Sequence, residues 1–121
     1  MITGTITDEL EPIINDVFIR TEKGKVIPIR TILDSGFNAS FCIPRRIIEE
    51  LNLNPVALEI FELADGTRIE EKIYVGEIVV DNQPFIIEIS GTDSETALMG
   101  MEMLLEKEAI FNLKTMEINV I

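Results

Sequence analysis

The chain has 121 residues, 46% of them hydrophobic, so it can bury a core in a single domain spanning residues 1–121. Its net charge of −12 disfavours nucleic acid and anionic membrane surfaces as partners, because both attract clustered Lys and Arg. It contains no histidine, which excludes Ser-His and Cys-His nucleophilic sites and the usual zinc sites within these residues.

The first part of the chain is predicted to form strands. Alternating β-branched and polar residues at 2–7 and 11–21 indicate two strands, and residues 26–33 indicate a third after a turn at 22–25. Proline lacks an amide hydrogen, so Pro28 places part of this third strand at a sheet edge or a bulge.

Residues 44–51 are predicted to form a short helix. Proline suits the first helical turn, and Ile47, Ile48 and Leu51 fall on one face. Residues 52–55 end the helix, because a residue that precedes proline avoids helical angles.

The remainder of the chain is again mostly strand. A long hairpin is predicted, with arms at 56–63 and 67–80 and the strong turn signal Asp65-Gly66 between them. The later elements, in chain order, are a turn at 81–84, a strand over 85–89, a polar loop over 90–96, a short helix after Gly100, and strands at 109–113 and 116–121. Six or more strands with two short helices predict a mainly β fold.

Two segments share one pattern, an apolar strand that ends at a glycine. They are Leu33-Asp34-Ser35-Gly36 and Leu98-Met99-Gly100, and only the first carries an acid. A carboxylate between apolar segments is costly unless it is paired, hydrogen-bonded or neutralised by a proton. Asp34 is therefore either an ordinary turn residue that faces water or a group with a functional role.

These segments resemble the two signatures of the retropepsin-like, or retroviral-type, aspartic protease family. The first resembles the Asp-Thr/Ser-Gly signature, and Leu98-Met99-Gly100 with the helix behind it is similar to the second. Ala64-Asp65-Gly66 lies between them, where that family has its flap hairpin. A small prokaryotic branch with an Asp-Ser-Gly-Phe signature is similar, with Phe37 after the glycine. The resemblance implies a mainly β, closed-barrel acid protease fold with one or two short helices.

The resemblance also implies an activity, hydrolysis of an extended peptide by water held between two aspartates that share a proton. Asp34 would be catalytic, Ser35 and Gly36 would shape the site, and the flap would cover the substrate. One chain supplies one such acid, so the site requires a homodimer. By analogy with the interleaved ends of the family, residues 1–7 and 116–121 are expected at the dimer contact. No metal or organic cofactor is required.

Other functions stay open beside this one. The chain is alternatively a non-catalytic dimeric module that binds peptides or assembles partners, or an inert monomer. The sequence favours a cytoplasmic protein. It has one cysteine, no recognisable secretory signal and no apolar run long enough to cross a bilayer.

A few further side chains carry expectations. Cys42 is expected to be a buried hydrophobe, and Phe37 is expected to narrow the cleft or to pack beneath it. Met99, Met101 and Met103 are expected to pack in the core, because methionine fills irregular gaps. Arg45 and Arg46 are expected on the solvent-exposed side of the first helix.

Overall fold

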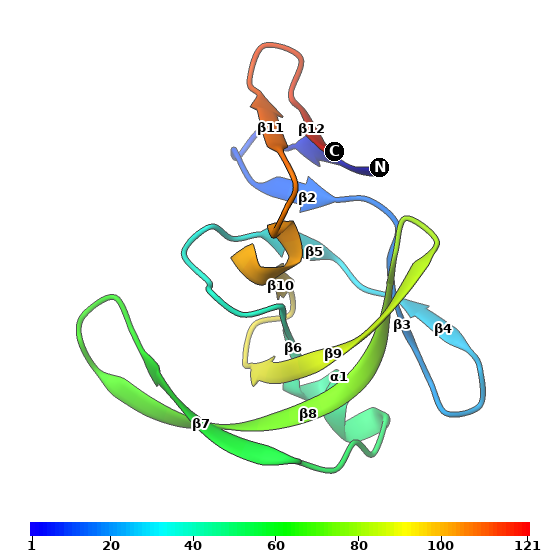
Figure 1. Ribbon diagram of the computed structural model, residues 1–121, viewed down its shortest axis with the longest axis vertical. Coiled ribbons are helices and arrows are strands. Elements are labelled where there is room, and N and C mark those ends of the chain that lie inside the picture. Colours follow the sequence, from blue (N-terminus) through cyan, green and yellow to red (C-terminus); the bar gives the residue numbers. More distant parts are fainter.

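The computed structural model describes residues 1–121 and is built mainly of strands (Figure 1). The strands are β1 (Ile2–Ile6), β2 (Pro12–Ile14), β3 (Val17–Arg20), β4 (Val26–Pro28), β5 (Thr31–Leu33), β6 (Phe41–Pro44), β7 (Ala57–Glu62), β8 (Arg68–Val80), β9 (Gln83–Thr92), β10 (Ala97–Met99), β11 (Ala109–Asn112) and β12 (Glu117–Val120). The helices are α1 (Arg45–Glu50) and a single 3₁₀ turn, η1 (Met101–Leu104). The predicted mainly β class is confirmed.

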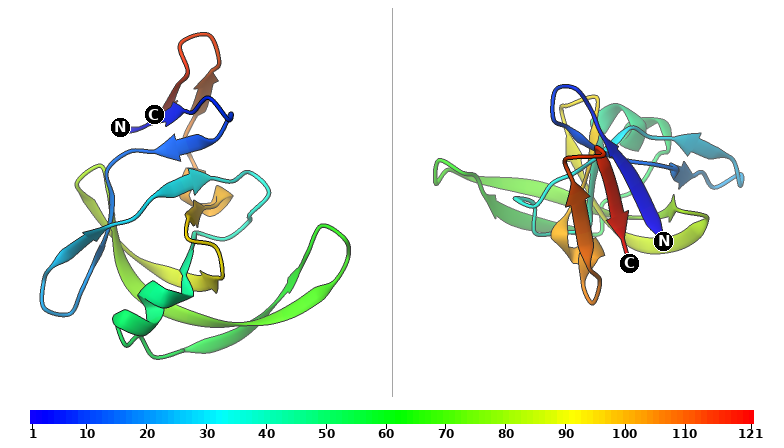
Figure 2. Two further views of the ribbon diagram at one scale, coloured as in Figure 1. Left: turned by 180° about the vertical axis from the view of Figure 1, so that it is seen from behind. Right: turned by 90° about the horizontal axis from the view of Figure 1, so that it is seen from above.

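The strands form one sheet in the order β11-β12-β1-β2-β5-β10-β6-β9-β8-β3-β4, with β7 paired to β8 beside this path. The end strands β11 and β4 do not pair with each other, so the sheet is open and the expected closed barrel is wrong in this detail. Pro28 in β4 has no amide hydrogen to donate, which fits a strand with a free edge. Figure 2 shows the β3–β4 and β7–β8 hairpins projecting on opposite sides of the body.

The centre of the sheet joins segments that lie far apart in the sequence. β5 runs parallel to β10, with Leu33 opposite Met99. β10 is antiparallel to β6, and β6 is parallel to β9. These pairings place the two glycine-containing segments of the sequence side by side.

One hydrophobic core lies behind these central strands. Its fully or almost fully buried members include Leu33, Phe41, Ile43, Ile89, Met99 and Ile118. Cys42 and Met103 are buried as predicted, but Met101 is 43% exposed, so its predicted place in the core is wrong. Met101 opens the 3₁₀ turn directly after Gly100, and its side chain is directed away from the core.

Several predicted elements have different bounds in the structure. The strand predicted over 11–21 is divided into β2 and β3, because Asp16 adopts a left-handed conformation (φ 56°) and the chain passes to new partner strands there. The strand predicted over 26–33 is likewise divided into β4 and β5. β9 continues through Thr92, into the predicted polar loop, because its last residues pair with β6. The second predicted helix is only the one turn η1.

Both terminal strands are paired within the chain. β12 lies between β11 and β1, and β1 lies between β12 and β2. Neither β1 nor β12 therefore has a free edge. A dimer contact at residues 1–7 and 116–121 could not add a further strand beside either of them. None of the helices is long and apolar enough to cross a membrane.

Candidate active site

Asp34 directly follows β5, at the point where the central strands end. Its backbone amide donates to the carbonyl oxygen of Met99 at 2.9 Å, so the acid is anchored on the second glycine-containing segment. The Asp34 carboxylate is half-buried, and its Oδ1 atom accepts a hydrogen bond of 2.8 Å from the Gly36 amide. The amide of Phe37 donates to the Asp34 carbonyl oxygen at 3.1 Å. This short turn fixes the direction of the carboxylate.

Gly36 leaves room for that carboxylate. A Cβ atom added at Gly36 would lie 3.2 Å from Oδ1 of Asp34, which is tighter than most real contacts. Ser35, between the two, is exposed and does not line the cleft described below. Of the three residues in the predicted signature, Asp34 and Gly36 line the cleft.

Gly100 supports the loop from the other side. A Cβ atom there would lie 2.0 Å from the Ala39 carbonyl oxygen and 2.7 Å from the Phe37 carbonyl oxygen. The backbones touch because the Gly100 amide donates to the Ser40 carbonyl at 2.8 Å and the Met101 amide donates to the Phe37 carbonyl at 2.8 Å. Only glycine permits this approach, so Gly100 acts as a structural residue beneath residues 34–40.

A cleft of about 860 Å³ opens beside Asp34. Its lining comes from the loop after β5, from β6, from the end of β9 and from the β7–β8 hairpin. Phe37 lines this cleft, and its Cδ2 atom lies 2.7 Å from the position of a Cβ on Gly100, so the ring also packs against that glycine. The lining includes six acids (Asp34, Glu59, Glu62, Glu71, Asp93, Glu102) and one base (Arg45).

The β7–β8 hairpin occupies the predicted place of the flap and projects from the body (Figures 1 and 2). Ala64 lines the cleft, whereas Asp65 and Gly66 form the outer tip. Gly66 has φ 87°, which favours glycine. Hydrogen bonds from the side chain and the amide of Thr67 lower the pKa of the Asp65 carboxyl, and the amide bond is 2.9 Å long.

Residues of the second predicted signature fall on two sides of β10. Leu98 lines the cleft, and Met99 is fully buried in the core. Cys42 is opposite Leu98 in β6 and also borders the cleft, while burial raises the pKa of its thiol.

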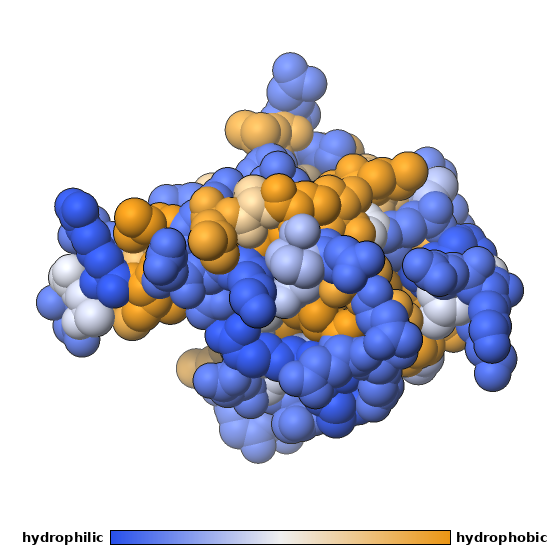
Figure 3. Space-filling model, turned by 90° about the horizontal axis from the view of Figure 1, so that it is seen from below, coloured by the Kyte–Doolittle hydropathy of each residue, from blue (hydrophilic) through white to orange (hydrophobic).

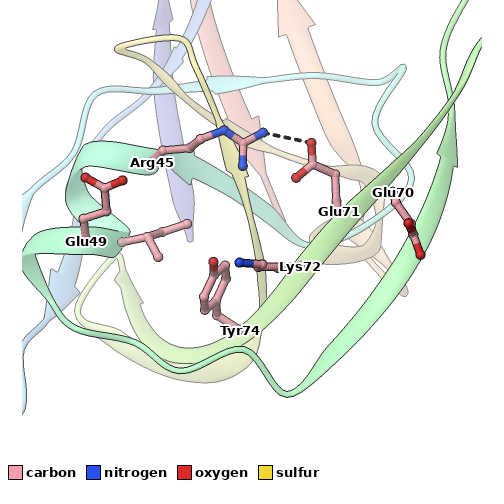
Figure 4. A pocket seen from close by; sticks show the side chains of 7 residues that line it. Arg45, Glu49, Glu70, Glu71, Lys72 and Tyr74 are labelled. Carbon is pink, nitrogen blue, oxygen red and sulfur yellow. Dashed lines mark hydrogen bonds and ion pairs between the residues drawn. The ribbon is translucent and has the colours of Figure 1, made fainter.

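Arg45 lies at one end of the cleft and was not expected there. Its Nη2 atom lies 2.8 Å from Oε1 of Glu71, and its Nε atom lies 2.7 Å from Oδ1 of Asp93 (Figure 4 shows the Glu71 pair). These two hydrogen bonds raise the pKa of the guanidinium. The Arg45 side chain is 43% exposed, as predicted for the wet side of the first helix, but its ion pairs with a residue of β8 and a residue of the loop after β9 were not predicted. No local pattern in the sequence links them.

Comparison of the sequence with protein-family models and with curated proteins gave no match. Solved structures are similar in fold. A retropepsin-like aspartic protease from Rickettsia conorii aligns with a TM-score of 0.63 and 14% identity, over 96% of this chain and 86% of that one. The simian foamy virus (mac) protease aligns with a TM-score of 0.53 and 18% identity, over 76% of this chain and 94% of that one.

The foamy viral protease-reverse transcriptase in complex with double-stranded DNA aligns with a TM-score of 0.52 and 13% identity, over 71% of this chain. The aligned part spans only 14% of that longer protein. The other two structures are matched over most of their length, with TM-scores of 0.53 and 0.63. The chain therefore has the retropepsin-like fold of aspartic proteases.

Proposed function

We propose that this chain is an aspartic endopeptidase, active as a homodimer in which Asp34 meets the Asp34 of a second copy. The observation that carries the proposal is the position of Asp34, at the end of a central strand and beside a cleft of about 860 Å³. Its carboxylate is oriented by the Gly36 amide and its loop rests on Gly100. The exposed turn residue Asp65 accepts the same kind of bond, so the support for the proposal comes from the cleft and from the close packing of the loop on Gly100.

The proposed chemistry uses one proton shared by two carboxyl groups, because like charges so close cannot both ionise. The ionised carboxylate takes a proton from a water molecule, whose oxygen attacks the carbonyl carbon of the peptide. The other carboxyl donates its proton to the carbonyl oxygen, which gives a tetrahedral diol. When the C–N bond breaks, the leaving nitrogen takes the proton from the first carboxyl, and the second recovers its proton from a diol hydroxyl.

An extended peptide is the substrate that suits this cleft. The β7–β8 hairpin forms one wall, and an extended chain can add hydrogen bonds to exposed backbone as a further strand does. Movement of the hairpin toward Asp34 would exclude bulk water from the cleft and leave the one reacting water molecule between the two acids. We place the activity in the cytoplasm, where the free thiol of Cys42 stays reduced.

The test compares Asp34→Asn with a matched variant, Asp8→Asn, on a library of peptides at several acidic and neutral pH values. Loss of the catalytic carboxylate should lower the cleavage rate by about 10²–10⁴-fold, because proton transfer by a positioned group contributes that much. Asp8 is exposed in the turn after β1 and does not line the cleft, so its variant should cleave at close to the normal rate. Equal cleavage by both variants would remove Asp34 from the mechanism.

A second candidate function is a dimeric peptide-binding module with no turnover. It is favoured by the apolar side chains of β7, of which Leu58 is 63% and Ile60 is 69% exposed. Figure 3 shows apolar atoms running across the lower face of the molecule, to which β7 and β8 belong. Peptide binding by the wild-type chain and by Asp34→Asn alike, with no cleavage by either, would select this function over proteolysis.

A further inference from the structure

Two glutamates lie opposite each other on the face of the β7–β8 hairpin that lines the cleft. Glu59 of β7 is in register with Glu71 of β8, and both belong to the lining. Side chains of directly opposite residues share one face of the sheet, with Cβ atoms about 4.5–5.5 Å apart. Like charges in this position repel and destabilise the pairing. A positive charge beside the two carboxylates would remove that repulsion.

Only one of the two glutamates has a cation beside it in the structure. The side chain of Glu71 is 14% exposed and lies 2.8 Å from Nη2 of Arg45. The same guanidinium lies 2.7 Å from Asp93, so two acids share it. Glu59 is exposed and forms no ion pair. Its carboxylate can therefore accept a positive charge from outside the chain.

Arg45 shows which kind of cation the acids at this end of the cleft hold. Its guanidinium donates hydrogen bonds to Glu71 and to Asp93, and Figure 4 shows the first of these. Such charge-assisted bonds are roughly twice as strong as neutral ones. An organic cation suits the cleft better than a metal ion, because no three His, Cys, Asp or Glu side chains are grouped so that they could hold a metal.

Apolar side chains lie next to the two glutamates. Phe61 is opposite Ile69, one pair nearer the hairpin tip on the same face, and both line the cleft. Lys and Arg have long aliphatic stems that lie along apolar surface while the charged head stays in polar surroundings. A basic side chain can therefore place its stem against Phe61 and Ile69 and its head at Glu59.

The rest of the lining has no free positive charge to compete for these acids. Six acids line the cleft against one base, and that base, Arg45, is already paired with Glu71 and Asp93. A cleft lined by charges of one sign concentrates ligands of the other sign. Basic side chains are therefore attracted here and acidic ones are repelled.

We infer that Glu59, with Glu71 beside it, binds a Lys or Arg side chain of the substrate, so that the cleft selects extended peptides with a basic residue. The inference rests on the proposed function, because it names the substrate class of the same cleft. In this role Glu59 determines specificity and takes no part in the chemistry at Asp34.

A binding measurement tests the selectivity without requiring turnover. The probe is a short acetylated, fluorescein-labelled peptide of alternating threonine and valine, whose central residue is Lys or norleucine, or Arg or citrulline. Norleucine and citrulline nearly match the length of Lys and Arg but carry no charge. In the Asp34→Asn chain, which is not expected to cleave the probe, fluorescence anisotropy should show each basic peptide binding at least about tenfold tighter than its neutral match, as one charge-assisted hydrogen bond allows.

Two substitutions separate Glu59 from the overall charge of the chain. Glu59→Gln and Glu9→Gln, each in the Asp34→Asn chain, remove the same charge, but Glu9 is exposed in the turn after β1 and lies outside the cleft. The preference for Lys over norleucine should fall close to one in the first variant and stay at about tenfold in the second. A circular-dichroism melt checks folding, and Glu59→Gln should melt no lower than its parent because it removes the repulsion with Glu71.

Equal binding of the Lys and norleucine peptides by the parent chain would overturn the inference, and this comparison needs no substitution at Glu59. An undiminished preference in folded Glu59→Gln would overturn it as well. A preference that falls equally in both variants would assign it to the net charge of the chain, which also overturns the role of Glu59.

The two proposals fail in different ways. If the wild-type chain shows Asp34-dependent cleavage with no preference for basic peptides, the inference is wrong and the proposed function stands. If basic peptides bind in a Glu59-dependent way and the wild-type chain cleaves none of them, the selectivity stands and the proposed hydrolysis is wrong.

Discussion

Replacement of Gly100 by alanine tests the support of the Asp34 loop directly. Gly100 has φ −93° and ψ 178°, which alanine adopts without strain, so the variant tests only the close approach of the two backbones. The added Cβ would lie 2.0 Å from the Ala39 carbonyl oxygen, whereas real Cβ contacts essentially never fall below 3.0 Å. One of the two backbones must therefore move by about 1 Å or more.

The expected loss of stability follows from the contacts that this movement breaks. The amides of Gly100 and Met101 each donate a 2.8 Å hydrogen bond to the loop, and each bond contributes about 0.5–1.5 kcal/mol. Overpacking costs a further 1–3 kcal/mol or so. Alanine restricts the unfolded chain and recovers roughly 0.4–1 kcal/mol. The free energy of unfolding should therefore fall by about 1–6 kcal/mol, a large part of the typical total of about 5–15 kcal/mol.

Urea denaturation, followed by circular dichroism at two protein concentrations, measures this loss. Gly36→Ala is the matched control, because its Cβ would lie 3.2 Å from a single carboxylate oxygen and would touch no backbone of another segment. Its unfolding free energy should change by less than about 1 kcal/mol. A Gly100→Ala protein as stable as the Gly36→Ala protein would refute the proposed role of the close backbone contact.

Three further measurements check other parts of the structure. Because hydrogen bonds from Thr67 lower the pKa of Asp65, their contribution to the hairpin turn is present above the ordinary pKa of an aspartate and is lost as the pH falls through the lowered value; a carboxyl titration by NMR should show Asp65 titrating below the ordinary pKa of an aspartate. Burial raises the pKa of the Cys42 thiol, so alkylation at pH 8 should be much slower than for an Ile86→Cys thiol and should become fast in urea. Raising the salt concentration from about 0.01 to 0.15 M shortens the Debye length from about 30 to 8 Å, which weakens the repulsion between two copies of a chain with net charge −12, so the dimer should tighten; a dissociation constant that rises with salt would contradict this expectation.

Local signals in the sequence predicted most of the strands and the neighbourhood of Asp34. The turn at Asp65-Gly66, the helix after Pro44 and the final hairpin all depend on residues close together in the chain, and each is present in the structure. The two glycine-containing segments were recognised from the pattern that they share, an apolar strand that ends at a glycine. Their side-by-side placement follows from the β5–β10 pairing.

Features that depend on distant partners were not predicted. The strand predicted over 11–21 is broken at Asp16, because the chain changes partner strands there. The ion pairs of Arg45 join residues from three elements, and the exposure of Met101 depends on the 3₁₀ turn being only four residues long. Propensity and periodicity contain no information about such long-range contacts.

The parallel pairing of β5 with β10 has a consequence for synthesis of the chain. The Asp34 loop rests on Met99 and Gly100, which a ribosome adds long after Asp34 itself. Strand pairings between such remote parts of a chain form slowly, because the intervening loop must close first. A nascent chain therefore carries the acid without its scaffold until the residues through Gly100 have been translated, and the loop is completed only after that.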